Sequence, residues 1–179
     1  MTSPFHVDLN AQAQALLALD RAPSTLGLYP LVRNHRGRII LTGAGTSHFA
    51  ALPSWRRLVS RGRATWWIEA GRLLDTPELV SPDSLLIVTS RSGRCAEAVA
   101  LVQKFDQTNR PKAIIAITND AASPLAESAD CEILLRSPPE ERSSGFLNTL
   151  AAHDYVATMI LSEDNDEIPA TAGVVTATT

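Results

Sequence analysis

The sequence has little of what marks several large classes of protein. Its 179 residues include only two cysteines, Cys95 and Cys131, which show neither CxxC spacing nor paired histidines. A metal site is therefore not expected, and two lone cysteines fit a reducing compartment. The formal net charge is −3, so the overall charge gives no reason to expect nucleic acid or an anionic membrane as a partner. Any positive site for an anion has to be local.

Long hydrophobic runs are missing as well. No apolar stretch approaches the roughly 20 residues that a membrane-spanning helix requires. Residues 1–8 lack the basic segment and apolar run of a secretory signal. These absences favour a cytoplasmic protein that does not bind membranes. With 45% hydrophobic and 20% charged residues, the chain has the composition of a globular protein and the length for one domain with a sizeable core.

Short apolar segments alternate with helical segments along most of the chain. Ala98, Leu101, Val102 and Phe105, for example, form the i, i+3, i+4, i+7 stripe of a helix packed on a sheet. This alternation predicts an α/β fold, a three-layer αβα sandwich with a five-stranded parallel sheet of flavodoxin-like order. The expected strands are 38–42, 64–68, 85–89, 113–117 and 131–135, and the expected helices are 47–61, 94–107, 124–128 and 143–161.

The two ends of the chain depart from this pattern. Residues 1–34 are expected to form a helical segment, with one helix over 9–20, that packs on a main domain spanning residues 35–161. Residues 162–179 begin with an acidic run. They are either a flexible tail or the start of a second domain.

A glycine turn, Gly43-Ala44-Gly45-Thr46-Ser47, follows the first expected strand. In an open parallel sheet, ligands bind beyond the carboxyl ends of the strands. The glycines allow close backbone approach, and the two hydroxyls together with the N–H groups of the next helix favour an anion. The alternative is a plain tight turn with Ser47 as helix cap. His48 replaces the third glycine of a dinucleotide fingerprint and the lysine of a P-loop is absent, so no cofactor is expected.

A second polar turn, Ser90-Arg91-Ser92-Gly93-Arg94-Cys95, follows the strand expected over 85–89. Small hydroxyls and backbone N–H groups form a compact cup for an oxyanion, and the two guanidinium groups add positive charge. The alternative is a capped turn whose arginines face solvent. Two such turns at one edge of a sheet favour phosphate as the ligand.

With these motifs, residues 35–160 resemble the SIS (sugar isomerase) domain family. Gly43–Ser47 is similar to its opening glycine turn, Ser90–Gly93 to its Ser-X-Ser-Gly phosphate loop, and Ser123–Asp130 to its SxLAxxAD segment. The likeness is greatest to the first SIS halves of two enzyme groups of amino sugar metabolism. These are the isomerase part of glucosamine-6-phosphate synthase and the galactosamine- or tagatose-6-phosphate isomerase-deaminases.

The resemblance implies a site for the phosphate of a hexose or aminohexose phosphate. It implies that Ser47, Ser90 and Ser92 hydrogen-bond the phosphate. Arg91 stands where the family often has Gln, and Cys95 where it often has Thr. The resemblance also implies a homodimer or a partner SIS domain. The complete expected set for the phosphate is Gly45, Thr46, Ser47, Ser90, Arg91, Ser92, Gly93 and Cys95.

A catalytic base is harder to find than a phosphate site. Aldose–ketose isomerisation needs a group that moves a proton between two carbons. Double-SIS enzymes resembling this chain take it from a second half or a neighbouring subunit, and single-domain isomerases from a Glu early in the last helix, where this chain has Asn148 and Thr149. The remaining candidates are His48, Glu141 and His153, followed by Glu97 and Glu140, and each of them also has a purely structural interpretation.

Two functional hypotheses follow from these features. In the first, the chain is the phosphosugar-binding part of an isomerase or deaminase, and its catalytic base lies outside this chain. In the second, the domain senses a phosphosugar without catalysis and regulates by binding.

Overall fold

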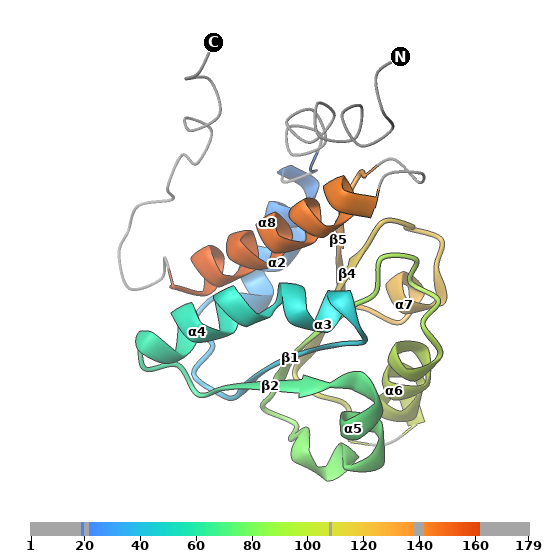
Figure 1. Cartoon of the computed structure of the whole chain (residues 1–179). Helices are drawn as coiled ribbons and strands as arrows, with labels where there is room; N and C mark the ends of the chain where they lie inside the picture. Colours follow the sequence, from blue (N-terminus) through green and yellow to red (C-terminus); the bar gives the residue numbers. More distant parts are fainter. Residues whose placement is uncertain (1–18, 20–21, 108, 138–141, 162–179) are drawn as a thin grey trace, which may run out of the picture.

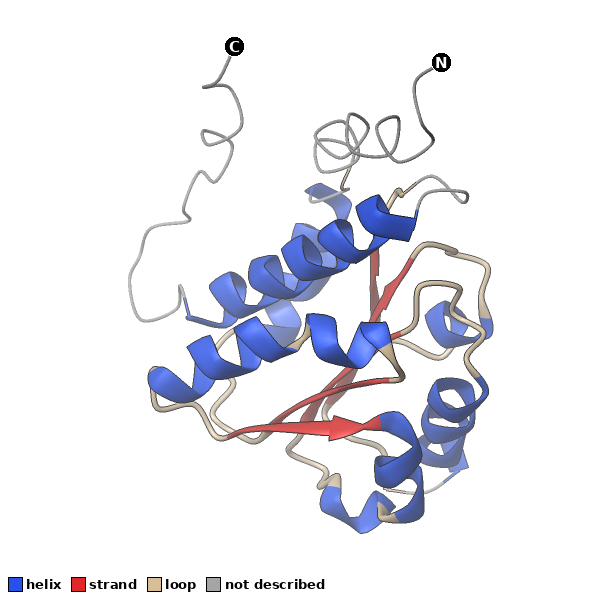
Figure 2. Cartoon of the chain, in the orientation of Figure 1, coloured by secondary structure: helices blue, strands red, loops and turns tan. Residues whose placement is uncertain are grey.

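A computed structural model describes residues 19, 22–107, 109–137 and 142–161. Its centre is a five-stranded parallel sheet in the order β2-β1-β3-β4-β5 (Figure 2). The predicted α/β class and flavodoxin-like order are confirmed. The strands are β1 (Ile39–Gly43), β2 (Thr65–Glu69), β3 (Leu85–Thr89), β4 (Ala113–Thr118) and β5 (Cys131–Leu134).

Helices cover both faces of this sheet, as Figure 1 shows. One face carries α2 (Ala22–Val32), α3 (Thr46–Ala50), α4 (Leu52–Ser60) and α8 (Arg142–Leu161), and the other carries α5 (Ala70–Asp75), α6 (Ala96–Gln107) and α7 (Pro124–Glu127), with a short 3-10 turn, η1 (Pro77–Leu79), after α5. Within the described residues no helix is long and apolar enough to cross a membrane.

The three central strands, β1, β3 and β4, are mostly apolar because both of their faces are covered. Every residue of β1, β3 and β4 is buried. Ile87 points into the core beneath α4 and α8, whereas its neighbours Leu86 and Val88 point into the core beneath α5 and α6. Burial of each such side chain contributes roughly 1.5–3 kcal/mol. Two apolar cores, one on each face, therefore hold the sheet in place. The polar loops that follow the strands lie at the carboxyl edge of the sheet.

The predicted helix over 47–61 is wrong in one respect, because the structure has two helices there. Pro53 stands in the first turn of α4 and has no N–H to donate to the carbonyl of Phe49, so the first helix ends at Ala50. The helix α5 was not predicted, since six residues are too short to show a helical period. The helix expected over 9–20 and the tail 162–179 lie outside the described residues, apart from Leu19.

Within the segment expected to be helical and to pack on the domain, the described part is α2. Its residue Gly27 lies against Cys131 of β5, where an added Cβ would be 3.2 Å from the Cys131 sulfur. The helix therefore closes the sheet at the β5 edge. The division of the chain at residues 34 and 161 stays a prediction.

Candidate functional site

The carboxyl ends of β1, β3 and β4 bring three loops together. Gly43 of β1 is in register with Thr89 of β3, and Thr89 with Ile117 of β4, so the segments that follow these strands start at the same edge. Between them lies a cleft of about 520 Å³, lined by Ser47, Ser90, Arg91, Ser92, Arg94, Asn119 and Asp120. The structure thus joins two sequence motifs, which lie far apart in the chain, in one cleft.

The loop after β3 is held by its own hydrogen bonds. The Ser90 N–H donates to the Ile117 carbonyl at 3.1 Å, and the Gly93 N–H donates back to the Ser90 carbonyl at 2.9 Å. The Ser90 Oγ accepts the Cys95 N–H at 3.4 Å, and the Ser92 Oγ accepts the Arg94 N–H at 3.2 Å. Both serine hydroxyls therefore keep their proton for donation to a ligand oxygen.

Gly93 makes the tight curve of this loop possible. Its φ is +65°, and a Cβ at this position would lie 2.0 Å from the Ser123 Oγ and 2.9 Å from the Thr118 Oγ1. Gly93 is buried and lies behind the cleft, and it does not appear among the residues that line it. Gly93 therefore shapes the turn that carries Ser90 and Ser92.

Asn119 and Asp120 form a third wall that sequence reasoning missed. The Asn119 side chain donates to the Ser137 carbonyl and accepts the Ser137 N–H, both at 2.8 Å. The backbone N–H of Asn119 donates to the Arg91 carbonyl at 2.8 Å. The pKa of the Asp120 carboxyl is lowered by the Ala122 N–H and then by Arg94. Their position directly after β4 was the available signal, because all three strands end at one edge.

The two arginines of the loop have different surroundings. Arg94 forms an ion pair with Asp120 at 2.9 Å. Arg91 lies against the first turn of α8, where a Cβ on Gly145 would be 2.8 Å from the guanidinium carbon. Next to it is a second cavity of about 380 Å³, lined by Thr46, Ser47, Arg91, Gly145, Phe146 and Thr149.

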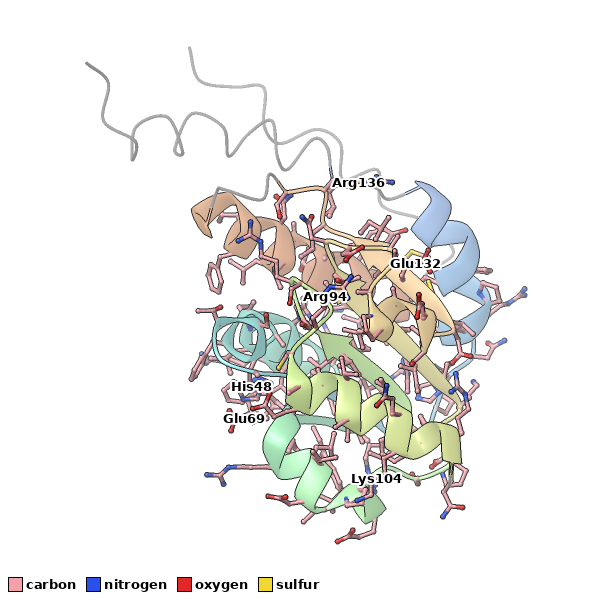
Figure 3. The ribbon with its side chains drawn as sticks, turned by 90° about the vertical axis from the view of Figure 1, so that its right-hand side faces the viewer. His48, Glu69, Arg94, Lys104, Glu132 and Arg136 are labelled. Carbon is pink, nitrogen blue, oxygen red and sulfur yellow. The ribbon has the colours of Figure 1, made fainter. Side chains whose placement is uncertain are left out.

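Gly45 and His48 belong to a third cavity on the β2 side. Gly45 has a φ of +54°, and the His48 ring stacks on Trp67 with ring centroids 4.1 Å apart and planes 1° from parallel. Burial lowers the pKa of His48, and Glu69 opposes this effect. Figure 3 shows His48 and Glu69 next to each other and apart from Arg94. The cavity has about 480 Å³ and is lined by Gly45, His48, Phe49, Trp67, Ile68, Glu69 and Arg72.

Two further predicted residues lie away from all three cavities. His153 of α8 is buried, its Nε2 is 2.9 Å from the Thr89 Oγ1, and burial lowers its pKa to about 3. The Cys95 thiol donates to Glu97 at 3.0 Å, and burial raises the pKa of this thiol. Of Cys95, only the backbone N–H contacts the Ser90 side chain. Neither side chain lines the cleft or the cavities beside it.

The described lining of the cleft and of the second cavity contains one carboxylate, Asp120, and no histidine. Glu140 and Glu141, two of the predicted candidates for a base, lie outside the described residues. In the described ranges, no three His, Cys, Asp or Glu side chains are grouped so that they could hold a metal ion. The arrangement is suited to anchoring an anion by hydroxyls, N–H groups and guanidinium groups.

Comparison with known proteins places this geometry in a family. The SIS domain model matches residues 32–161. The chain is 32% identical over 142 residues to the glutamine–fructose-6-phosphate aminotransferase [isomerizing] of Legionella pneumophila, and this alignment covers 77% of the chain and 22% of the relative. It is 32% identical over 111 residues to arabinose 5-phosphate isomerase KpsF of Escherichia coli, and this alignment covers 62% of the chain and 34% of the relative. The chain thus spans no more than about a third of these two relatives.

Solved structures share the fold. A protein involved in capsule formation in Bacteroides fragilis superposes with a TM-score of 0.79 at 20% identity, over 89% of both chains. The Vibrio vulnificus NanR protein, complexed with ManNAc-6P, superposes with a TM-score of 0.73 at 16% identity, over 90% of this chain and 64% of that one. At these identities the likeness establishes the arrangement of strands and helices.

Proposed function

The chain belongs to the SIS domain family, and from that premise we propose that its cleft binds a hexose or aminohexose 6-phosphate. The observation that carries the proposal is the convergence of Ser47, Ser90 and Ser92 with two arginines in one cleft at the carboxyl edge of the sheet. Such a set satisfies several oxygens of one phosphate group at once. The names of two relatives, an isomerizing aminotransferase and an arabinose 5-phosphate isomerase, support a phosphosugar as the ligand.

In this proposal each group around the phosphate has its own task. Ser90 and Ser92 donate their hydroxyl protons, because their oxygens already accept backbone N–H groups. Ser47 donates from the opposite wall, next to Thr46 and Gly45. Arg94, which forms an ion pair with Asp120, and Arg91 both line the cleft, so two guanidinium groups add positive charge beside the phosphate. Gly93 and the Cys95 N–H keep the loop in the required shape.

We further propose that the chain is the phosphosugar-binding part of an aldose–ketose isomerase or deaminase. The proton-transferring base would come from a second SIS domain or from the partner in a homodimer, in a cytoplasmic protein. This is supported by the described lining of the cleft, whose one carboxylate, Asp120, is held deprotonated and weakly basic by Ala122 and Arg94. A base that moves a proton between carbons efficiently needs a pKa near the pH at which the enzyme works.

The absence of an effective base from the described lining of the cleft also supports a second function, regulation by phosphosugar binding without turnover. The two functions are separated by assaying the pure chain for aldose–ketose interconversion and for ammonia release. Turnover by the chain alone would refute a base supplied from outside. Turnover only after addition of a partner domain would support the isomerase, and binding without turnover in either case would support the sensor.

Ser90→Ala and Ser92→Ala are each expected to weaken hexose 6-phosphate binding by about 1–3 kcal/mol, because each leaves a phosphate oxygen without its donor. The measurement is the shift in melting temperature on titration with glucose, fructose and glucosamine 6-phosphates. Ser60→Ala is the matched control, since Ser60 lies on the surface of α4 and bonds only the Arg57 carbonyl. If none of the sugar phosphates stabilises the wild-type protein, the proposed ligand class is wrong.

A further inference from the structure

Asp120 is the one residue in the described lining of the phosphate cleft that works against an anion. The other side chains there are hydroxyls, an amide and guanidinium groups. The Ala122 N–H and then Arg94 lower the pKa of the Asp120 carboxyl, so this group is charged at neutral pH. A negative charge beside a bound phosphate repels it. Asp120 therefore acts on the affinity of the cleft as well as on its shape.

Asp120 is fixed by its own loop and holds Arg94. Its Oδ1 accepts the Ala122 N–H at 2.9 Å, and its carbonyl accepts the Ser123 hydroxyl at 2.6 Å. The Arg94 Nη2 donates to the Asp120 Oδ2 at 2.9 Å and to the Ala122 carbonyl at 3.4 Å. One end of the Arg94 guanidinium is thus bound to the loop that follows β4.

The ion pair is not needed to join the two loops that carry Arg94 and Asp120. The Asn119 N–H and the Thr118 hydroxyl donate to the Arg91 carbonyl at 2.8 and 3.3 Å, so the loops are already joined through the backbone. The ion pair itself is exposed, with 57% of the Arg94 side chain and 39% of the Asp120 side chain accessible. Exposed pairs add little to stability. The effect of this pair is therefore expected on the ligand rather than on the fold.

Arg94 keeps donors that a ligand can use. Among the described residues, the structure shows no partner for its Nε and Nη1. Arg94 lines the same cleft as Ser90 and Ser92, so a phosphate held by these serines would lie beside the guanidinium. A phosphate bonds a guanidinium best when two parallel N–H groups face it. Asp120 competes with the phosphate for this arrangement.

We infer that Asp120 limits the affinity of the cleft for phosphate, because it pairs with Arg94 and withholds part of that guanidinium from the ligand. This inference rests on the proposed function and adds an affinity-determining residue to it. Affinity differences between closely related complexes lie mostly in the rate of dissociation. A cleft restrained by Asp120 therefore releases its phosphosugar sooner, which suits a site that has to exchange its ligand.

The test uses Asp120→Asn, which removes the charge and keeps an oxygen for the Ala122 N–H. The probes are the 6-phosphates and the 6-sulfates of glucose, fructose and glucosamine. At pH 8 a phosphate ester carries close to two negative charges, whereas a sulfate ester of the same shape carries one. Isothermal titration should show the variant binding the sulfate roughly 3-fold and the phosphate roughly 10-fold more tightly, because the effect of a removed charge grows with the charge of the ligand.

Arg94→Gln tests whether the effect of Asp120 passes through the ion pair. With Arg94 replaced, Asp120→Asn should tighten phosphate binding only about 3-fold, since no guanidinium is left to be released to the ligand. Equivalently, loss of Arg94 should cost more affinity in the Asp120→Asn protein than in the wild type. An equal cost in both proteins would overturn the pairing.

Asp130→Asn is the matched control and should bind every probe like the wild type. Asp130 pairs with Arg110 at 2.9 Å and accepts the Ile114 N–H at 2.7 Å, near the amino end of β4 and away from the cleft. Unchanged or weaker phosphate binding by Asp120→Asn, or an equal gain for sulfate and phosphate, would overturn the inference and leave the proposed function standing. Failure of the wild type to bind any of the 6-phosphates would overturn both.

Discussion

Gly93→Ala should abolish phosphosugar binding and lower the free energy of unfolding by roughly 2–5 kcal/mol. An alanine at a φ of +65° is strained, and its Cβ would lie 2.0 Å from the Ser123 Oγ and 2.3 Å from the Ser123 Cβ. Ser123 cannot move away freely, because its hydroxyl donates to the Asp120 carbonyl at 2.6 Å and accepts the Ala126 N–H. The loop therefore has to shift, and Ser90 and Ser92 shift with it.

Gly62→Ala separates the clash from the backbone strain. Gly62 has a φ of +75°, but no atom lies within 4 Å of the Cβ that would be added. This variant should lose only the roughly 1–2 kcal/mol of backbone strain and should bind phosphosugar like the wild type. Urea denaturation and the ligand-induced melting shift of both variants are the measurements. A Gly93→Ala protein as stable as Gly62→Ala, with normal binding, would show that the loop does not depend on this glycine.

Acid should destabilise the protein through His153. Burial lowers the pKa of this histidine from 6.5 to about 3 in the folded protein, whereas it returns to its ordinary value on unfolding. Between these two values the unfolded chain binds more protons than the folded one, so the free energy of unfolding falls as the pH drops. Above about pH 6.5, His153 is neutral in the folded and in the unfolded protein and does not lower the free energy of unfolding. Between about pH 6.5 and 4.5, protonation of the unfolded chain lowers the free energy of unfolding by roughly 3 kcal/mol.

His153→Gln should remove this part of the pH dependence. Glutamine is neutral at every pH, and its amide can replace the contact with the Thr89 hydroxyl, which lies 2.9 Å from the histidine Nε2. His35, whose pKa is also lowered by burial, is present in both proteins and cancels in the comparison. The measurement is the free energy of unfolding in urea from about pH 7.5 to 4.5. Parallel curves for the two proteins would show that His153 does not take up the proton.

The same buried position explains why His153 is a poor candidate for proton transfer in the cleft. The sequence places it on an apolar face of the last helix, which allowed either a packed or a catalytic residue. The structure buries the side chain beneath Thr89, away from the described lining of the three cavities at the carboxyl edge. Its hydrogen bond joins α8 to the residue just before Ser90, so we expect it to influence the loop through position alone.

Much of the fold was accessible from the sequence because its signals are local. The strand over residues 85–89 was predicted with the observed bounds, and the strands around Ile40 and Ile115 were predicted within one residue of theirs. A continuous apolar run is enough to indicate a strand covered on both sides. The exceptions were local too, since the break before Pro53 and the six-residue α5 disturb or escape the helical period.

The sequence by itself determined that hydroxyls, glycines and arginines follow two buried strands, and the parallel order of the strands then required them to meet at one edge. Only the tertiary structure decided which residues share a cavity. Asn119 and Asp120 complete the cleft, His48 turns to the β2 side, and Arg91 packs on Gly145 of a helix far along the chain. Such contacts depend on how helices pack across the sheet, and hydrophobic periodicity records which face of a helix is buried but not which residue it meets.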